Sequence, residues 1–252
     1  VFFGLSNPRP ENKQLPDGDY EVIRIPSGNY ELEAWYISVD SANGDVILFH
    51  GYSGEKSSML ERATLIREMG FNTLVVDFHG SGGSSGNTTS IGYEEADDVK
   101  AAVDYLYEKG VERIQLLGTS MGAAAMLKAA SEYEIEVDRM IIECPFASML
   151  QTSQNRFEKL GLPAFPAAHI LVFWGGIENG FWGFSHNPAE YCMAVNVPCL
   201  LIYGEQDDRV KREEIDLIYQ NLPSEKDSLI LPRSGHANYL QMDKEAWKEK
   251  IA

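Results

Sequence analysis

Three residues in this chain have the types and the order required for nucleophilic catalysis by serine. Ser120 lies in Gly118-Thr-Ser-Met-Gly122, a G-x-S-x-G pattern between an apolar run and a helix-like segment. Such a strand–turn–helix elbow lifts a serine hydroxyl above a sheet. The hydroxyl needs a base, and the base needs an acid that orients it. Asp207 and His236 follow in that order, each just after an apolar run, and predict an acyl-transfer site.

Other residues compete for two of these roles. Gly82-Gly-Ser-Ser-Gly86 also matches the serine pattern, but no helical pattern follows Ser84 directly, so we expect a loop there. Asp208 adjoins Asp207, and Glu143 follows another apolar run. We favour Asp207 and keep Asp208 and then Glu143 as alternatives.

Apolar runs alternate with helical patterns along most of the chain, which predicts a doubly wound α/β sheet. An antiparallel pair is expected at Tyr20–Ile25 and Tyr30–Ser38. Buried parallel strands are expected at Asp45–Phe49, Thr73–Asp77, Arg113–Leu117, Arg139–Ile142, Cys199–Tyr203 and Ser228–Leu231. Helices are expected at Met59–Met69, Glu94–Glu108, Met121–Tyr133, Arg212–Leu222 and Tyr239–Ile251. The sum is an eight-stranded sheet flanked by helices.

Two segments depart from this alternation. Residues 1–19 are polar and proline-containing and are expected to be an N-terminal extension to a single domain spanning residues 20–252. Residues 148–190, after the sixth strand, are rich in aromatic residues and glycine. We expect a short lid-like insert there, because long connections of this kind are often functional. Its aromatic residues are candidate substrate contacts: Phe173, Trp174, Phe181 and Trp182.

These motifs together resemble the α/β-hydrolase superfamily, in its lysophospholipase, carboxylesterase and serine-aminopeptidase-like branch. The resemblance covers about residues 20–250 and rests on Phe49-His-Gly-Tyr52, Asp77-Phe-His-Gly-Ser-Gly-Gly-Ser84, the Ser120 elbow, Gly204-x-x-Asp207-x-x-Val210 and Gly235-His236. It implies the α/β-hydrolase fold and an oxyanion hole formed by the N–H groups of Tyr52 and Met121. It also implies that His50 anchors a loop, and that neither a metal nor a cofactor is needed. His79 stands where the family usually has arginine.

Composition limits the class of partner. The chain has 252 residues, 44% of them hydrophobic, which suffices for one sizeable core. Its net charge of −17 disfavours nucleic acid. We read the acidity as a solubility feature that favours neutral over anionic substrates. Three cysteines are too few for a disulfide scaffold, and no apolar stretch reaches the roughly 18 residues of a spanning helix. The sequence is compatible with a soluble cytoplasmic domain, or with export or anchoring through a removed N-terminal segment.

The expected activity is a serine hydrolase of the carboxylesterase or lipase type, acting on small-molecule esters of small or medium acyl chains. Peptidase, thioesterase and acyltransferase reactions use the same three residues, because a fold does not fix its function. An aminopeptidase would need carboxylates for the substrate amine, for which Glu178 and Glu190 are the candidates. A binding protein without catalysis is the remaining alternative. Oligomeric state is left open.

Overall fold

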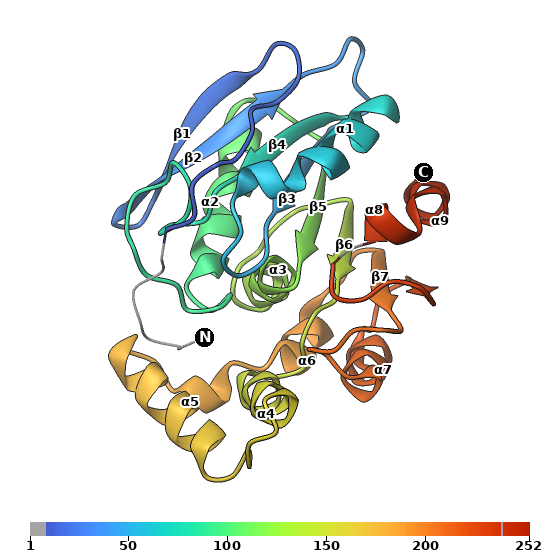
Figure 1. Ribbon diagram of the computed structural model, residues 1–252. Helices are drawn as coiled ribbons and strands as arrows, with labels where there is room; N and C mark the ends of the chain where they lie inside the picture. The colour runs from blue at the N-terminus through green and yellow to red at the C-terminus, as the bar shows by residue number, and fades with distance from the viewer. Residues whose placement is uncertain (1–8, 238) are drawn as a thin grey trace.

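The apolar runs form one sheet, as predicted. In the computed structural model, which describes residues 9–237 and 239–252, its strand order is β1-β2-β4-β3-β5-β6-β7-β8 (Figure 1). The strands are β1 (Glu21–Ser27), β2 (Tyr30–Ile37), β3 (Asp45–Phe49), β4 (Asn72–Val76), β5 (Ile114–Thr119), β6 (Arg139–Glu143), β7 (Cys199–Gly204) and β8 (Lys226–Leu231). The β1–β2 and β2–β4 pairs are antiparallel and the other pairs are parallel. This is the α/β-hydrolase architecture expected from the sequence.

Side chains alternate between the two faces of the sheet, and each face buries a separate apolar cluster. On β3, Ile47 and Phe49 belong to one cluster, and Val46 and Leu48 belong to the other. The first face is covered by α2 (Glu95–Glu108), α3 (Met121–Glu132) and α7 (Arg212–Asn221). The opposite face is covered by η1 (Lys56–Met59), α1 (Leu60–Glu68), α8 (Tyr239–Met242) and α9 (Lys244–Ile251). Both faces of the parallel strands are therefore shielded from solvent, which explains their continuous apolar sequences.

The C-terminal segment corrects one prediction. The sequence pattern predicts a single helix over Tyr239–Ile251, but the structure divides it at Asp243, where the backbone has φ −141° and ψ 42°. The Asp243 carboxylate accepts hydrogen bonds from Arg233, at 2.9 Å from Nε and 2.7 Å from Nη2, and from the hydroxyl of Ser234 at 2.8 Å. These contacts tie the residue to the loop before His236 and replace continuous helical geometry.

The insert after β6 is largely helical. It contains α4 (Met149–Lys159), α5 (Ala167–Glu178), η2 (Gly183–Ser185) and α6 (Pro188–Tyr191), followed by η3 (Cys192–Ala194). Helices α4 and α5 pack together and lie below the sheet in the view of Figure 1. The glycines of the aromatic-rich segment serve packing, because a Cβ on Gly176 would come within 2.5 Å of the backbone nitrogen of Gly183.

Helix α4 is fixed to the body of the protein by a buried amide. The Asn155 side chain donates to Oε1 of Glu214 at 2.6 Å and to the carbonyl of Arg209 at 3.0 Å. The other carboxylate oxygen of Glu214 accepts from the backbone of Ala147 at 2.9 Å. The start of the insert and the segment after β7 are therefore held together.

A buried ion network lies beside β2, β4 and η1. Lys56 is fully buried, and its ammonium group contacts Asp77 and lies 2.7 Å from Oε1 of Glu33. The centroid of the Trp35 ring lies 4.3 Å from the same ammonium nitrogen. Asp77 also accepts from the backbone of Lys56 at 2.6 Å and of Gly83 at 2.8 Å. Burial alone would raise the pKa of Asp77, but the charge of Lys56 lowers it.

The described part of the predicted N-terminal extension packs on this network. The amide of Asn12 donates to Asp77 at 3.1 Å and accepts from the backbone of Ser57 at 3.2 Å. The carbonyl of Pro10 accepts from the backbone of Gly82 at 2.9 Å. Residues 1–8 of the extension lie outside the described part. Among the described residues, no helix combines the length and the hydropathy needed to cross a bilayer, and the three cysteines are buried and unbridged.

Replacing Lys56 with methionine is predicted to destabilise the protein by about 3–5 kcal/mol, because removing one partner of a buried ion pair leaves the other charge uncompensated. The measurement is the free energy of unfolding in urea. Lys244→Met is the matched control, since Lys244 and its partner Glu61 are both about half exposed and such pairs contribute about 1 kcal/mol or less. Equal losses in the two variants would contradict the assignment of the network as a stabilising element.

Candidate active site

Ser120 lies on a strained turn between β5 and α3. Its backbone has φ 53° and ψ −107°, a conformation that residues other than glycine rarely adopt. Two glycines permit this turn. A Cβ on Gly118 would come within 2.6 Å of the Gly122 carbonyl carbon, and a Cβ on Gly122 would lie 2.5 Å from the carbonyl oxygen of Phe49. The Ser120 backbone N–H donates to the carbonyl of Glu143 at 2.8 Å, which ties the turn to β6.

Asp207 and His236 meet Ser120 from the ends of β7 and β8. Nε2 of His236 lies 3.1 Å from Oγ of Ser120, and Nδ1 lies 2.7 Å from Oδ2 of Asp207. The other oxygen of Asp207 accepts from the backbone of Arg209 at 2.8 Å and of Val210 at 3.0 Å. Asp207 can therefore accept a hydrogen bond from Nδ1–H, which leaves Nε2 unprotonated and able to accept the proton of the serine hydroxyl.

The loops that carry Asp207 and His236 approach each other at Gly204. A Cβ at that position would come within 2.3 Å of the Ser234 carbonyl oxygen. The backbone N–H of Gln206 donates to the same carbonyl at 3.0 Å. The glycine that opens the Gly204–Val210 motif is therefore needed for the approach of the two loops.

The pKa of His236 lies above its ordinary value of 6.5. Burial opposes the charged form, but the Cys144 sulfur and the Asp207 carboxylate outweigh this effect. Cys144 Sγ lies 3.9 Å from Nε2 of His236. This cysteine was not among the predicted site residues, although it directly follows Glu143 at the end of β6. Its position after a buried strand was the available signal.

Cys144, Asp207 and His236 also form the group of described residues that could hold a metal ion, since one donor atom from each lies within 4.8 Å of the others. The imidazole nitrogens in this group already contact Ser120 and Asp207. Their present arrangement is suited to proton transfer between Ser120 and His236, with the imidazole held by Asp207.

The two predicted oxyanion donors lie on adjoining segments. Met121 is the first residue of α3, and Tyr52 follows Gly51 after β3. A Cβ on Gly51 would lie 3.3 Å from the carbonyl of Thr119 and 3.6 Å from Cβ of Ser120. The loop that carries Tyr52 therefore lies directly against the turn that carries the serine.

Ser84 and His50 hold loops in place. The Ser84 hydroxyl is fully buried, donates to the carbonyl of Asp77 at 2.6 Å and accepts from the backbone of Glu33 at 2.8 Å. His50 accepts from the backbone of Phe78 at 3.2 Å, and its other ring nitrogen lies 2.8 Å from the carbonyl of Gly51. Burial lowers the pKa of His50, so the ring is neutral.

The alternative acids point elsewhere. Asp208 is exposed and forms an ion pair with Lys159. Glu143 is fully buried and accepts from Arg62 at 2.8 Å and from the indole nitrogen of Trp247 at 2.7 Å. Of the three acids, the structure places Asp207 against the imidazole.

His79, which replaces the usual arginine, keeps a positive charge at that position. Its ring nitrogen lies 2.7 Å from Oδ2 of Asp98, and the ring stacks on Tyr30 with 4.5 Å between centroids. Burial disfavours the charge, but the hydrogen bond to Asp98 and the nearby Glu95 raise the pKa of His79 to about 9. The imidazolium therefore pairs with the buried carboxylate.

A cavity of about 270 Å³ opens beside Ser120 and His236, and its wall includes Tyr52, Arg156 and Arg209. A second cavity of about 450 Å³ shares these last three residues and adds Lys159 and Leu160 from the end of α4. The insert thus contributes α4 to the site. Neither arginine was predicted. Arg209 adjoins the Asp207 motif, but only folding brings Arg156 to it.

The four aromatic candidates of the insert lie outside these two cavities. Phe173, Trp174 and Trp182 are 38%, 57% and 57% exposed. Phe181 stacks on Tyr93 with 3.8 Å between ring centroids. In the described structure, three of these side chains are substantially exposed, Phe181 packs on Tyr93 in the segment before α2, and the part of the insert at the cavities is α4.

The fold and this site together define a serine hydrolase of the α/β type. The sequence pattern of the family described as "Serine aminopeptidase, S33" matches residues 40–175, which is more than half of the chain, and the protein belongs to that family.

The chain is also similar to individual proteins. The chain is 26% identical to protein YqkD of Bacillus subtilis over 232 residues, covering 90% of this chain and 76% of the relative. It is 23% identical to the acylamino-acid-releasing enzyme of Rattus norvegicus, covering 91% of this chain and 32% of that enzyme. The Pyrococcus furiosus esterase Pf2001 has the same fold, with a TM-score of 0.80 and 24% identity over 98% of this chain and 95% of the esterase.

The raised pKa of His236 predicts a pH dependence. A neutral imidazole is needed to accept the serine proton, so kcat/KM for a neutral ester should fall as pH decreases through the pKa. The midpoint of this acid limb is expected above pH 6.5, with kcat/KM still rising between pH 6.5 and 8. The test is kcat/KM across pH at constant ionic strength. A plateau already reached at pH 6 would show that the environment of His236 does not stabilise its charged form.

Asp207→Asn is predicted to lower kcat on a p-nitrophenyl ester by about 10⁴-fold, because the imidazole loses the carboxylate that selects its tautomer. Asp208→Asn is the matched control, since its exposed carboxylate faces Lys159, and kcat should stay near the wild-type value. A large loss in Asp208→Asn with little loss in Asp207→Asn would reverse the assignment.

Proposed function

We propose that this serine hydrolase cleaves carboxylic esters through an acyl-enzyme on Ser120. The observation that carries the proposal is the continuous hydrogen-bonded path from Ser120 Oγ through His236 to Asp207, with distances of 3.1 and 2.7 Å. These distances are within the range for proton transfer between a nucleophile, a base and an orienting acid.

In the first half-reaction, Ser120 Oγ attacks the ester carbonyl carbon while its proton moves to Nε2 of His236. The carbonyl oxygen becomes an oxyanion, and the backbone N–H groups of Tyr52 and Met121 stabilise it. One such donor typically contributes about 10²–10³-fold to kcat. The bond to the alcohol oxygen then breaks, and His236 donates its proton to the departing alcohol.

In the second half-reaction, water attacks the acyl-enzyme carbonyl and His236 accepts a proton from the water. Collapse of the second tetrahedral intermediate releases the carboxylic acid, and the proton returns to Ser120. Asp207 stays ionised throughout and stabilises the imidazolium. Each residue ends in its starting protonation state.

Ester hydrolysis is favoured over aminopeptidase activity by the lining of the cavity. An aminopeptidase needs carboxylates near the nucleophile to hold the free amine of its substrate. Glu178 ends α5 and Glu190 lies on α6, and neither lines the cavity beside Ser120. The carboxylate in that lining, Glu55, accepts a hydrogen bond from the Ser57 hydroxyl at 2.7 Å.

A fluorophosphonate probe is predicted to label the wild-type protein and to fail on Ser120→Ala, because only an activated serine attacks phosphorus. Ser84→Ala is the matched control and should be labelled like the wild type, since the Ser84 hydroxyl already bonds to backbone groups on both sides. Persistent labelling of Ser120→Ala, or its loss in folded Ser84→Ala, would refute the nucleophile assignment.

Ester and anilide substrates, compared on the wild type and on Ser120→Ala, distinguish ester hydrolysis from amide hydrolysis. p-Nitrophenyl butyrate should be hydrolysed by the wild type, whereas alanine p-nitroanilide and N-acetylalanine p-nitroanilide should show no turnover above that of Ser120→Ala. Efficient cleavage of the free alanine anilide would establish an aminopeptidase instead, and cleavage of only the acetylated anilide would establish an acylaminoacyl peptidase.

A further inference from the structure

Two arginines in the candidate active site have no acidic partner among the residues that the structure describes. Arg156 on α4 and Arg209 after β7 line both cavities. Among the ion pairs of residues 9–237 and 239–252, neither side chain takes part. Arg62 also lines the Ser120 cavity, but Glu143 neutralises it at 2.8 Å. Lys13, which is exposed, lines the Ser120 cavity but not the second one and also takes part in none of these ion pairs. Among the described residues, Arg156 and Arg209 are therefore the unpaired cations that line both cavities.

These two groups line the same two cavities, and their like charges repel each other. Burial and the charge of Arg209 both lower the pKa of Arg156, and no carboxylate offsets them. Arg156 is half-buried and Arg209 is exposed, so the pair lies at the boundary between cavity and solvent. An anion between the guanidinium groups would relieve the repulsion and could accept hydrogen bonds from both.

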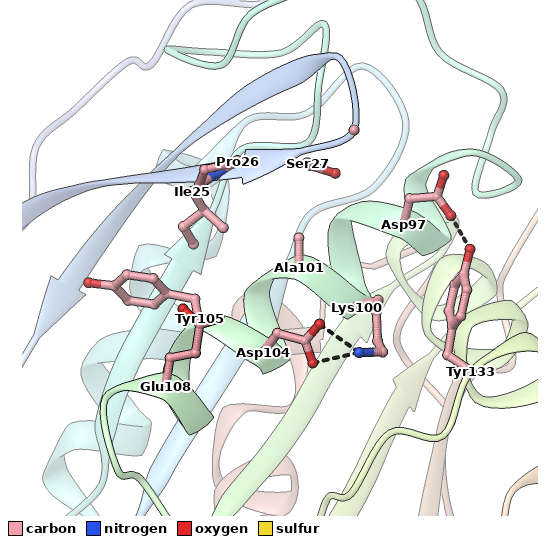
Figure 2. Close-up of a pocket in the computed structure, with 11 residues that line it drawn as sticks. Ile25, Pro26, Ser27, Asp97, Lys100, Ala101, Asp104, Tyr105, Glu108 and Tyr133 are labelled. Carbon is pink, nitrogen blue, oxygen red and sulfur yellow. Dashed lines mark hydrogen bonds and ion pairs between the residues drawn. The ribbon is translucent and has the colours of Figure 1, made fainter.

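The protein as a whole is acidic, in contrast to these two arginines. The chain carries −17 overall. A separate hollow of about 420 Å³ between the end of β1 and α2 is lined by Asp97, Asp104 and Glu108 (Figure 2). The cation in its wall, Lys100, is paired with Asp104 at 2.6 Å. The unpaired arginines beside Ser120 are therefore a local feature that the composition does not account for.

We infer that the substrate carries an anionic group, a carboxylate or a phosphate, which Arg156 and Arg209 bind while the ester carbonyl lies at Ser120. The inference rests on the proposed function and specifies its substrate class. Tyr52 and Leu160 line the second cavity with the arginines and give the chain between ester and anion an apolar wall. This reverses the expectation of neutral esters drawn from net charge, because a substrate meets the local field of the cavity.

Matched ester pairs test the inference. One pair is mono-p-nitrophenyl glutarate and p-nitrophenyl valerate. The other is 1-butyrylglycerol 3-phosphate and 1-butyrylglycerol. The ratio of kcat/KM for the anionic over the neutral member should lie between about 10 and 100 for at least one pair. The pair that shows it distinguishes a carboxylate from a phosphate.

The variant R156Q/R209Q should lower this ratio to about one, and R156K/R209K should retain part of it. R113Q/R212Q removes two arginines that lie outside both cavities and pair with Asp138 and Asp216, and it should leave the ratio unchanged. Ratios near one in the wild type for both pairs, or a preference that survives R156Q/R209Q, would overturn the inference.

A binding measurement separates this inference from the proposed reaction. Calorimetry on Ser120→Ala with glutarate and with glycerol 3-phosphate should detect binding of at least one anion, and adding R156Q/R209Q should abolish it. If no ester is hydrolysed but this binding is seen and lost as described, the ester reaction fails and the anion site stands. If esters are hydrolysed but neither anion binds and neither ratio exceeds one, the reaction stands and the anion site is wrong.

Discussion

The left-handed backbone of Ser120 is the constraint on which the site depends. A non-glycine residue in such a conformation costs about 1–3 kcal/mol, which the surroundings must supply. Here the carbonyl of Glu143 holds the serine N–H, and two glycines let α3 begin directly against β5 and β3. The strain places the side chain above the strand ends and the first turn of α3 next to the Tyr52 loop. The candidate nucleophile and the proposed oxyanion donors are therefore positioned by one feature of the backbone.

Much of the fold and part of the site could be predicted because they depend on local patterns. Strands buried on both faces have continuous apolar sequences, and the glycines around Ser120 are required by the turn itself. Asp207 could be preferred over Asp208 from the motif spacing, and the structure places it against His236. The break at Asp243 was missed because its cause is the contact with Arg233 and Ser234, which helical periodicity does not contain.

The substrate side of the site could not be predicted in the same way. Aromatic residues in the insert made α5 the expected wall, yet the orientation of α5 depends on close packing at Gly176 and Gly183. Arg156 reaches the cavity only because α4 docks on the segment after β7. Net charge averages over the whole chain and does not resolve the cationic side chains that line the cavity. Contacts between distant segments decide these points, and one sequence does not display them.

The side-chain amide of Asn155 connects α4 to the segment that follows β7. It holds α4 to Glu214 and to the carbonyl of Arg209, two residues after Asp207. These hydrogen bonds connect α4 directly to the backbone of the segment that carries Asp207 and Arg209. A ligand that binds to α4 needs to order little of the protein, so less of its binding energy is lost to conformational entropy. The binding surface on α4 is therefore preorganised, and most of the conformational entropy lost on binding would come from the ligand.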